Sequence, residues 1–408
     1  MSLWRKKCLM SLENFLISEI VLRKIDVIDC DFMQIRFLEK EREKKAEILS
    51  QEEYKRAADI AIENEKFELF SNFYSLIINI AWLGFGFAYL KSLLISENSK
   101  LENTLFLLVF LVITALFNLP LSIYKDFVKN KAQGFSNMSV SLFIKDSLKS
   151  LALLLIFGFA IIYVLLLCYE FLGALWWLGA FAFSFCVILV INLIYPTLIA
   201  PLFNKMQKLD DENLLGKIEN LMKQCGFSAN GVYVIDASKR DKRLNAYFGG
   251  LFKSKRVVLF DTLLKALSEK ELLAVLGHEL GHFVHKDILK ALISGALMLF
   301  ILFFLFANLP EFFYTESGLE GVNAGVFALL LIFGSIFTSL VSPLLNLLSR
   351  KNEFAADLHG AKLSSKEDMK NALIALAKEN KAFVKTSKIY TIFHLSHPSI
   401  SERLKALS

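Results

Sequence analysis

The chain has 408 residues, of which 55% are hydrophobic and 38 are phenylalanine. This apolar share exceeds the roughly 45–50% that is usual for soluble domains and indicates a membrane protein. The formal net charge of +6 is modest, and no basic stripe is interleaved with aromatic residues, so nucleic-acid binding is not expected. The five cysteines are scattered and form no CxxC pair, which argues against a disulfide framework or a thiolate metal site.

Six apolar runs are long enough to cross a bilayer, which takes roughly 20 residues. They lie at 69–90, 104–124, 150–172, 174–199, 288–308 and 325–347. Charges break the apolar patch within residues 1–31, so we expect an interfacial helix or a poorly ordered extension there and not a signal peptide. The predicted sections are an N-terminal cytoplasmic or interfacial extension (1–68), four transmembrane helices (69–199), a polar segment (200–287), two transmembrane helices (288–347) and a C-terminal helical segment (348–408).

Basic residues predict the orientation of these spans. The segments 1–68, 125–149, 200–287 and 350–408 are rich in Lys and Arg, whereas 309–324 has three glutamates and no basic residue. With six spans, every basic segment falls on one side of the membrane, and the positive-inside rule makes that side cytoplasmic. Both termini and both polar regions that contain histidine are therefore expected in the cytoplasm.

The polar segment 200–287 is expected to fold outside the bilayer. Apolar residues at one helical spacing predict a helix that stops at Gly226. Short β-branched and aromatic runs follow at 231–236, 245–252 and 256–261, and they predict a small sheet.

Capping boxes mark three further helices. Ser268-Glu269-Lys270-Glu271 predicts a helix that begins near Glu269. Ser365 with Asp368 and Ser399 with Glu402 repeat the pattern, so the C-terminal segment is predicted to be helical and folded.

The helix predicted from Glu269 carries the sequence HELGH at residues 278–282. Residues i and i+4 share a helix face, so His278 and His282 can offer two imidazoles to one metal ion. Glu279 would then face the open coordination position, where it can take a proton from the attacking water and pass it to the leaving amine. The alternative is a pair of hydrogen-bonded histidines on a buried helix face.

Two histidines need a third ligand from elsewhere. His285 would approach the ion poorly from the same straight helix, and catalytic sites usually take this ligand from another element. In the segment 349–360, Glu353 and Asp357 share a helix face. Glu353 can bind the metal while Asp357 accepts a hydrogen bond from a ligand imidazole. A solvated acidic helix face is the alternative interpretation of these two carboxylates.

The sequence HELGH, followed by NEFAAD at 352–357, resembles the integral-membrane zinc metalloproteases of the CAAX prenyl protease type 1 family, in a bacterial-type version. The segments 201–209, 235–264 and 397–407 are also similar to this family, and KNKAQGFSNMS (129–139) echoes it. The resemblance implies an all-α multi-pass membrane protein with a cytoplasmic, gluzincin-like α+β zinc protease domain. The family has seven spans, whereas this sequence predicts six.

The resemblance also implies roles for individual residues. It implies that His278, His282 and Glu353 bind one Zn²⁺ per chain and that Glu279 is the general base. It places substrate-binding residues at Asn245, Ala246, Tyr247 and Arg403, and a histidine near the scissile carbonyl at His397. A strand edge at 245–247 would suit an extended peptide, and His397 could donate to the developing oxyanion or be a structural loop residue. His285, His359 and His394 are assigned structural roles.

Three functions are consistent with these patterns. The first is a membrane-embedded zinc metalloendopeptidase, for which the resemblance implies C-terminal processing of prenylated CAAX peptides. The second has the same chemistry but serves membrane-protein quality control, as in heat-shock-type membrane proteases. The third is a transporter with an incidental HExxH, which the lack of charged residues deep in the six spans disfavours.

Partners and location follow from these hypotheses. We expect a peptide or protein substrate, with a lipidated one among the alternatives, together with the lipid bilayer and no nucleic acid. The richness in Lys, Phe, Ile and Asn suggests an AT-rich bacterial genome, so the expected location is the bacterial inner membrane, with the endoplasmic reticulum membrane as the alternative. The sequence leaves the oligomeric state open.

Overall fold

The computed structural model describes residues 30–250 and 255–408, and most of them are helical. The helices of the first half are 30–42, α2 (Gln51–Ala81), α3 (Phe87–Leu94), α4 (Lys100–Ile123), α5 (Asn130–Ala132), α6 (Val140–Leu153), α7 (Phe159–Phe171), α8 (Trp176–Ile194) and α9 (Ala200–Phe203). Those of the second half are α10 (Glu212–Gln224), α11 (Asp261–Ala266), α12 (Glu269–Val284), α13 (Asp287–Ala307), α14 (Phe312–Glu316), α15 (Gly325–Leu363), α16 (Lys366–Glu379), α17 (Lys388–His394) and α18 (Ile400–Ala406).

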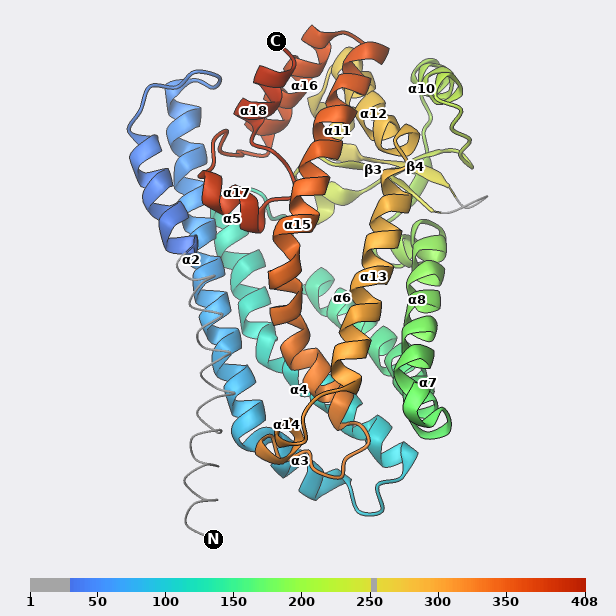
Figure 1. Ribbon diagram of the computed structural model, residues 1–408. Coiled ribbons are helices and arrows are strands. Elements are labelled where there is room, and N and C mark those ends of the chain that lie inside the picture. The colour runs from blue at the N-terminus through green and yellow to red at the C-terminus, as the bar shows by residue number, and fades with distance from the viewer. Residues whose placement is uncertain (1–29, 251–254) are drawn as a thin grey trace.

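The described residues contain six helices that are long and apolar enough to cross a membrane, which confirms the six predicted spans. They are Gln51–Leu94, Lys100–Ala132, Val140–Phe171, Gly173–Phe203, Asp287–Ala307 and Gly325–Leu363. Single π-helical turns join shorter helices into four of them, at Trp82–Gly86, Tyr124–Lys129, Leu154–Gly158 and Tyr195–Ile199. In Figure 1 these helices run side by side, with the sheet and α12, α16 and α18 at one end and α3 and α14 at the other.

The spans pack around an apolar core at the end of the bundle that holds α3 and α14 (Figure 1). Phe87 and Phe106 are fully buried there and lie near Phe110, whose ring centroid is 5.1 Å from that of Phe87. Trp176 packs edge-on against Phe327 of α15. This interlocked aromatic cluster fixes the spans at the end of the molecule remote from the sheet.

The small sheet predicted for the polar segment is present and has four strands among the described residues. They are β1 (Met206–Lys208), β2 (Val232–Ile235), β3 (Ala246–Gly249) and β4 (Arg256–Phe260), in the order β1-β2-β4-β3. The central pair β2 and β4 is parallel, and β1 and β3 pair antiparallel to their neighbours. β3 is therefore an edge strand, and the sheet shares an apolar core with α10, α12 and α16.

The predicted capping boxes are formed at two of the three expected helix starts, and the third start is capped by a serine side chain. Ser268 and Ser399 each close a complete box at the starts of α12 and α18. At the start of α16, the Ser365 hydroxyl accepts from the Asp368 amide. These caps fix where the site-bearing and C-terminal helices begin.

The helix of the first span begins well before the apolar run, at Gln51. α2 begins at a capping box on Ser50 and continues without a break into the first span, so residues 51–68 belong to the same helix as that span. Tyr54 is buried, and its ring packs at a tilt of 49° against Phe383 of the C-terminal segment, with centroids 4.8 Å apart. The interpretation of residues 1–31 falls almost wholly outside the described residues.

Candidate metal centre

The site lies where α12 crosses α15, and glycines allow these two helices to approach closely. A Cβ atom on Gly281 would lie 2.9 Å from the Cα of Ala356. A Cβ atom on Gly360 would lie 2.9 Å from the Ala274 carbonyl oxygen and 2.9 Å from the His278 nitrogen. Side chains at these positions would separate the helices. The close crossing brings the neighbouring polar side chains of the two helices together.

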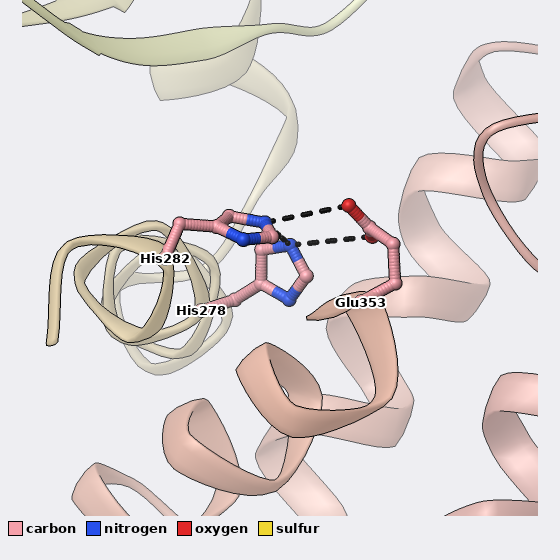
Figure 2. Close-up of side chains that lie close together, drawn as sticks. All are labelled: His278, His282 and Glu353. Atoms are coloured by element: carbon pink, nitrogen blue, oxygen red, sulfur yellow. Dashed lines mark hydrogen bonds and ion pairs between the residues drawn. The ribbon is translucent and has the colours of Figure 1, made fainter. Parts of the chain in front are cut away.

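Three of these side chains converge on one point. His278 and His282 project from α12 toward Glu353 on α15, as Figure 2 shows. The two Nε2 atoms are 3.2 Å apart, His282 Nε2 is 3.3 Å from Glu353 Oε1, and His278 Nε2 is 3.6 Å from Glu353 Oε2. Among the described residues, this is the one group of three such side chains whose donor atoms all lie within 4.8 Å of one another.

The spacing of the donor atoms suits a tetrahedral ion. Bonds of about 2.0–2.1 Å to a tetrahedral zinc ion put its ligand atoms about 3.3 Å apart, close to the three observed separations. Glu353 Oε2 is buried and accepts no hydrogen bond from the described residues, although Arg403 and His278 nitrogens lie 3.6 Å from it. A buried carboxylate oxygen without a hydrogen-bond donor is costly unless a cation compensates it. The residues therefore fit a metal ion.

Asp357 orients the first histidine, as the sequence predicts. Its Oδ1 is 2.9 Å from His278 Nδ1, so the ring can donate from Nδ1 and present Nε2 to the cluster. Arg403 of α18 donates two hydrogen bonds to Asp357, from Nε at 2.8 Å and from Nη2 at 2.6 Å. Asp357 and Arg403 are both buried. The last helix of the chain thus fastens the carboxylate that fixes the His278 ring.

Asp287 orients the second histidine, and sequence reasoning missed it. Its Oδ2 is 2.9 Å from His282 Nδ1, and its Oδ1 accepts from Lys290 Nζ at 2.8 Å. Asp287 follows Lys286, which adopts a left-handed conformation (φ 58°) and turns the chain between α12 and α13. This turn brings the first residue of α13 back to the end of α12. The available signal was an acidic residue shortly after HExxH.

The charges of the cluster already attract a cation. Burial lowers the pKa of His282, but hydrogen bonds to Glu353 and Asp287 outweigh burial and raise this pKa to about 9. The carboxylates thus hold a proton on the ring, and a metal cation bound by His278, His282 and Glu353 would take the place of that proton. For Glu279, burial raises the pKa of the carboxyl, His278 and His282 lower it, and Glu353 raises it again.

Glu279 and His282 line a cavity of about 290 Å³. The same cavity is also lined by Phe248 and Gly249 of the edge strand β3 and by Phe227 and Phe283. A second cavity of about 430 Å³ shares five lining residues with the first: Gly250, Lys255, His282, Phe283 and Ile288. Its other lining residues are mostly aliphatic side chains of α8 and α13, namely Leu189, Val190, Leu193, Leu289 and Leu292.

The predicted substrate residues lie at the beginning of β3 and just before it. Asn245 is exposed, Ala246 is buried, and Tyr247 is half-buried against Tyr195. Burial raises the pKa of Tyr247 to about 12, so its phenol is neutral. The cavity wall is formed by the next two residues of the strand, which no sequence pattern singled out.

His397 reaches the cluster from the loop before α18. Its Nε2 lies 3.2 Å from Glu353 Oε1, its Nδ1 lies 2.9 Å from the Ser396 hydroxyl, and its side chain is 62% exposed. His285, His359 and His394 are not members of the cluster. His394 instead stacks on Tyr390 with ring centroids 4.7 Å apart.

Known proteins resemble both halves of the chain. Residues 34–205 match the family described as CAAX prenyl protease N-terminal, five membrane helices, and residues 208–408 match peptidase family M48. In an alignment 410 residues long, CAAX prenyl protease 1 homolog of Taenia solium is 33% identical, with 88% of this chain and 87% of that protein covered. In an alignment 317 residues long, CAAX prenyl protease 1 of Saccharomyces cerevisiae is 36% identical, with 72% of this chain and 69% of that protein covered.

A solved structure agrees over nearly the whole length. The crystal structure of S. mikatae Ste24p superposes with a TM-score of 0.88 at 29% identity, covering 98% of this chain and 99% of that chain. The overall fold, the two matched families and the named relatives all point to a metallopeptidase. The group of potential metal ligands around the HExxH helix is consistent with this. The chain therefore belongs to the CAAX prenyl protease 1 family, the membrane-embedded metalloproteases of peptidase family M48.

Proposed function

We propose that the chain is a zinc endopeptidase in which His278, His282 and Glu353 bind one Zn²⁺ and Glu279 is the general base. The convergence of the three donor atoms beside a cavity that Glu279 lines is the observation that carries this proposal. Two imidazoles and one carboxylate are the ligand set of many catalytic zinc sites, which keep one position open. Asp357 and Asp287 each fix one imidazole in the tautomer that leaves Nε2 free.

The residues of the chain divide the hydrolytic reaction between them. A zinc ion bound here supplies Lewis acidity toward water and the scissile carbonyl. Glu279 takes a proton from the attacking water and delivers it to the leaving amine. Its burial supports this role, because a carboxyl with a raised pKa holds the proton more readily between the two steps. His397, at the rim of the cluster, donates to the developing oxyanion.

Substrate is bound along the edge strand β3. An extended peptide can add to a free strand edge through main-chain hydrogen bonds, which is the role proposed for Asn245, Ala246 and Tyr247. Phe227, Phe248 and Phe283 belong to the same cavity as Glu279, which favours apolar side chains next to the scissile bond. Arg403 was expected to bind substrate, and its contacts with Asp357 support a positioning role instead.

The substrate that we favour is a prenylated peptide cut near its C-terminus, as the names of the relatives indicate for those proteins. The aliphatic cavity that adjoins the site supports this choice, because it can accept an apolar chain. Quality control of membrane proteins is the second candidate, since the same cavity would take apolar peptide segments. Comparing cleavage of one peptide with and without a prenyl group distinguishes these two. Membership of a peptidase family leaves the transporter hypothesis without support.

The location proposed is a membrane with the metal centre on its cytoplasmic side. The six apolar helices and the clustering of basic segments on one side support it. We place the protein in a bacterial inner membrane, with the endoplasmic reticulum as the alternative.

Substitution of Glu279 tests the proposed reaction. Glu279→Gln keeps the shape of the side chain but cannot accept a proton, so cleavage of a peptide should fall by roughly 10²–10⁴-fold while zinc content and melting temperature stay unchanged. Glu269→Gln at the exposed start of the same helix is the matched control and should cleave normally. Wild-type cleavage by Glu279→Gln would exclude this glutamate as the base and undermine the peptidase assignment of the site.

A further inference from the structure

A second group of potential metal ligands lies where α10, α12 and α15 meet. Cys225 ends α10, His285 ends α12, and His359 belongs to α15. Cys225 Sγ is 3.5 Å from His359 Nε2, and the rings of His285 and His359 have centroids 5.7 Å apart at an interplanar angle of 75°. The proposed zinc centre uses none of these three side chains.

The Cys225–His359 separation has the value expected for two ligands of one ion. A tetrahedral zinc ion with bonds of about 2.3 Å to sulfur and about 2.0–2.1 Å to nitrogen holds these atoms about 3.5 Å apart. The two imidazoles of the HExxH motif have ring centroids 4.8 Å apart, and those of the second group are slightly further apart. Donor atoms of the second group are not all within 4.8 Å of one another, so the His285 ring must turn to complete the set.

Two alternatives to a metal ion are a simple thiol–imidazole hydrogen bond and a reactive cysteine thiolate. Both leave part of the arrangement unexplained. A thiol–imidazole hydrogen bond involves Cys225 and His359, but it leaves the buried Nδ1 of His285 without a hydrogen-bond partner among the described residues. A reactive thiolate is disfavoured because burial raises the pKa of the Cys225 thiol. A bound metal ion removes this obstacle, since coordination deprotonates a thiol, and it gives the His285 nitrogen a partner.

We propose that Cys225, His285 and His359 form a second metal site, selective for a thiolate-preferring divalent ion such as Zn²⁺, that links α10 to the α12–α15 crossing. Soft thiolate and imidazole donors favour zinc over magnesium or calcium. No carboxylate hydrogen bond to either imidazole of this group is found among the described residues, whereas each histidine of the first site has one. The second site is therefore weaker and fills only after the first.

Cobalt binding tests this site independently of peptidase activity. Co²⁺ replaces Zn²⁺ in tetrahedral sites, and a cobalt–thiolate bond gives a near-ultraviolet charge-transfer absorption. The first site has only nitrogen and oxygen donors, so this absorption reports on a cysteine ligand. Titration with Co²⁺ of the full-length protein in detergent, loaded with only one zinc ion per chain, should produce the band with one cobalt per chain, together with a rise in melting temperature.

Variants assign the band to the proposed ligands. Cys225→Ser should abolish it and His359→Ala or His285→Ala should weaken cobalt binding at least tenfold, whereas Cys168→Ser, in α7, should keep it. Each variant should retain its first zinc ion. Without added cobalt, each should also have the melting temperature of the wild type, which shows that it is folded. A wild-type protein without the band at millimolar Co²⁺, or an unchanged band in Cys225→Ser, would overturn the proposal.

Discussion

Replacing Gly360 by alanine should damage metal binding more than it damages folding. The new Cβ would lie 2.9 Å from two backbone atoms of α12, one of them the nitrogen of His278. Ordinary contacts need about 3.5–4.0 Å, so α15 must move away by roughly 0.5–1 Å. Such overpacking costs about 1–3 kcal/mol, and the better helix propensity of alanine returns up to about 1 kcal/mol. The free energy of unfolding should therefore fall by only about 0–3 kcal/mol.

The metal centre has less tolerance for this movement. Glu353 lies on α15 and the two histidines lie on α12. A shift of α15 by roughly 0.5–1 Å therefore changes the distances between the Glu353 carboxylate and the two imidazoles by a similar amount. Metal–ligand distances in real sites vary by only about 0.2 Å. We expect zinc affinity, measured by competition with a chelator, to fall at least tenfold, and peptide cleavage to fall with it.

Gly216→Ala is the control variant for this test. Gly216 lies inside α10, and a Cβ atom there would meet nothing within 4 Å. Gly216→Ala should keep zinc affinity and gain up to about 1 kcal/mol of stability from helix propensity. If Gly360→Ala binds zinc as tightly as the wild type, the close helix crossing does not hold the ligands in place.

Further predictions concern the cluster itself. Glu353→Ala and His282→Ala should be isolated with little zinc, whereas His285→Ala should keep the first ion; full metal content in either of the first two removes that residue from the ligand set. Asp287→Asn should weaken zinc binding about 10–100-fold by releasing the His282 ring, and an unchanged dissociation constant would show that the contact is incidental. Chelation should abolish cleavage reversibly without loss of helical circular dichroism, because the aromatic core of the spans is remote from the metal; loss of helicity would contradict this.

The spans, the sheet and the pairing of His278 with His282 on one helix face could be predicted because each depends on local pattern. Hydropathy over about 20 residues is sufficient for a span, and capping boxes locate a helix start to within a residue or two. The start of the first helix at Gln51 could not be predicted from hydropathy, because polar residues continue a helix beyond an apolar run as readily as they end it. β1 was missed because three residues without apolar alternation carry almost no strand signal.

The residues that contact the proposed ligands were harder to predict than the proposed ligands themselves. Asp357 was predicted because it shares a helix face with Glu353. Asp287 was not, because its approach to His282 depends on the left-handed conformation of Lys286, which no helical periodicity describes. The contact of Arg403 with Asp357 joins α18 to α15 and depends on tertiary packing.

The lengths of the helices put the His278–His282–Glu353 cluster just beyond the apolar runs of two spans. α15 has 39 residues, about 58 Å at 1.5 Å per residue, whereas the hydrocarbon core is about 30 Å thick. Its apolar run ends near residue 347, and Glu353 follows six residues later, about 9 Å further along the helix axis. On the other helix, Asp287 contacts His282 and is also the first residue of the span α13. Both sides of the cluster are thus joined directly to helices long and apolar enough to cross a membrane, which supports the proposal that the peptide substrate is cut at the bilayer surface.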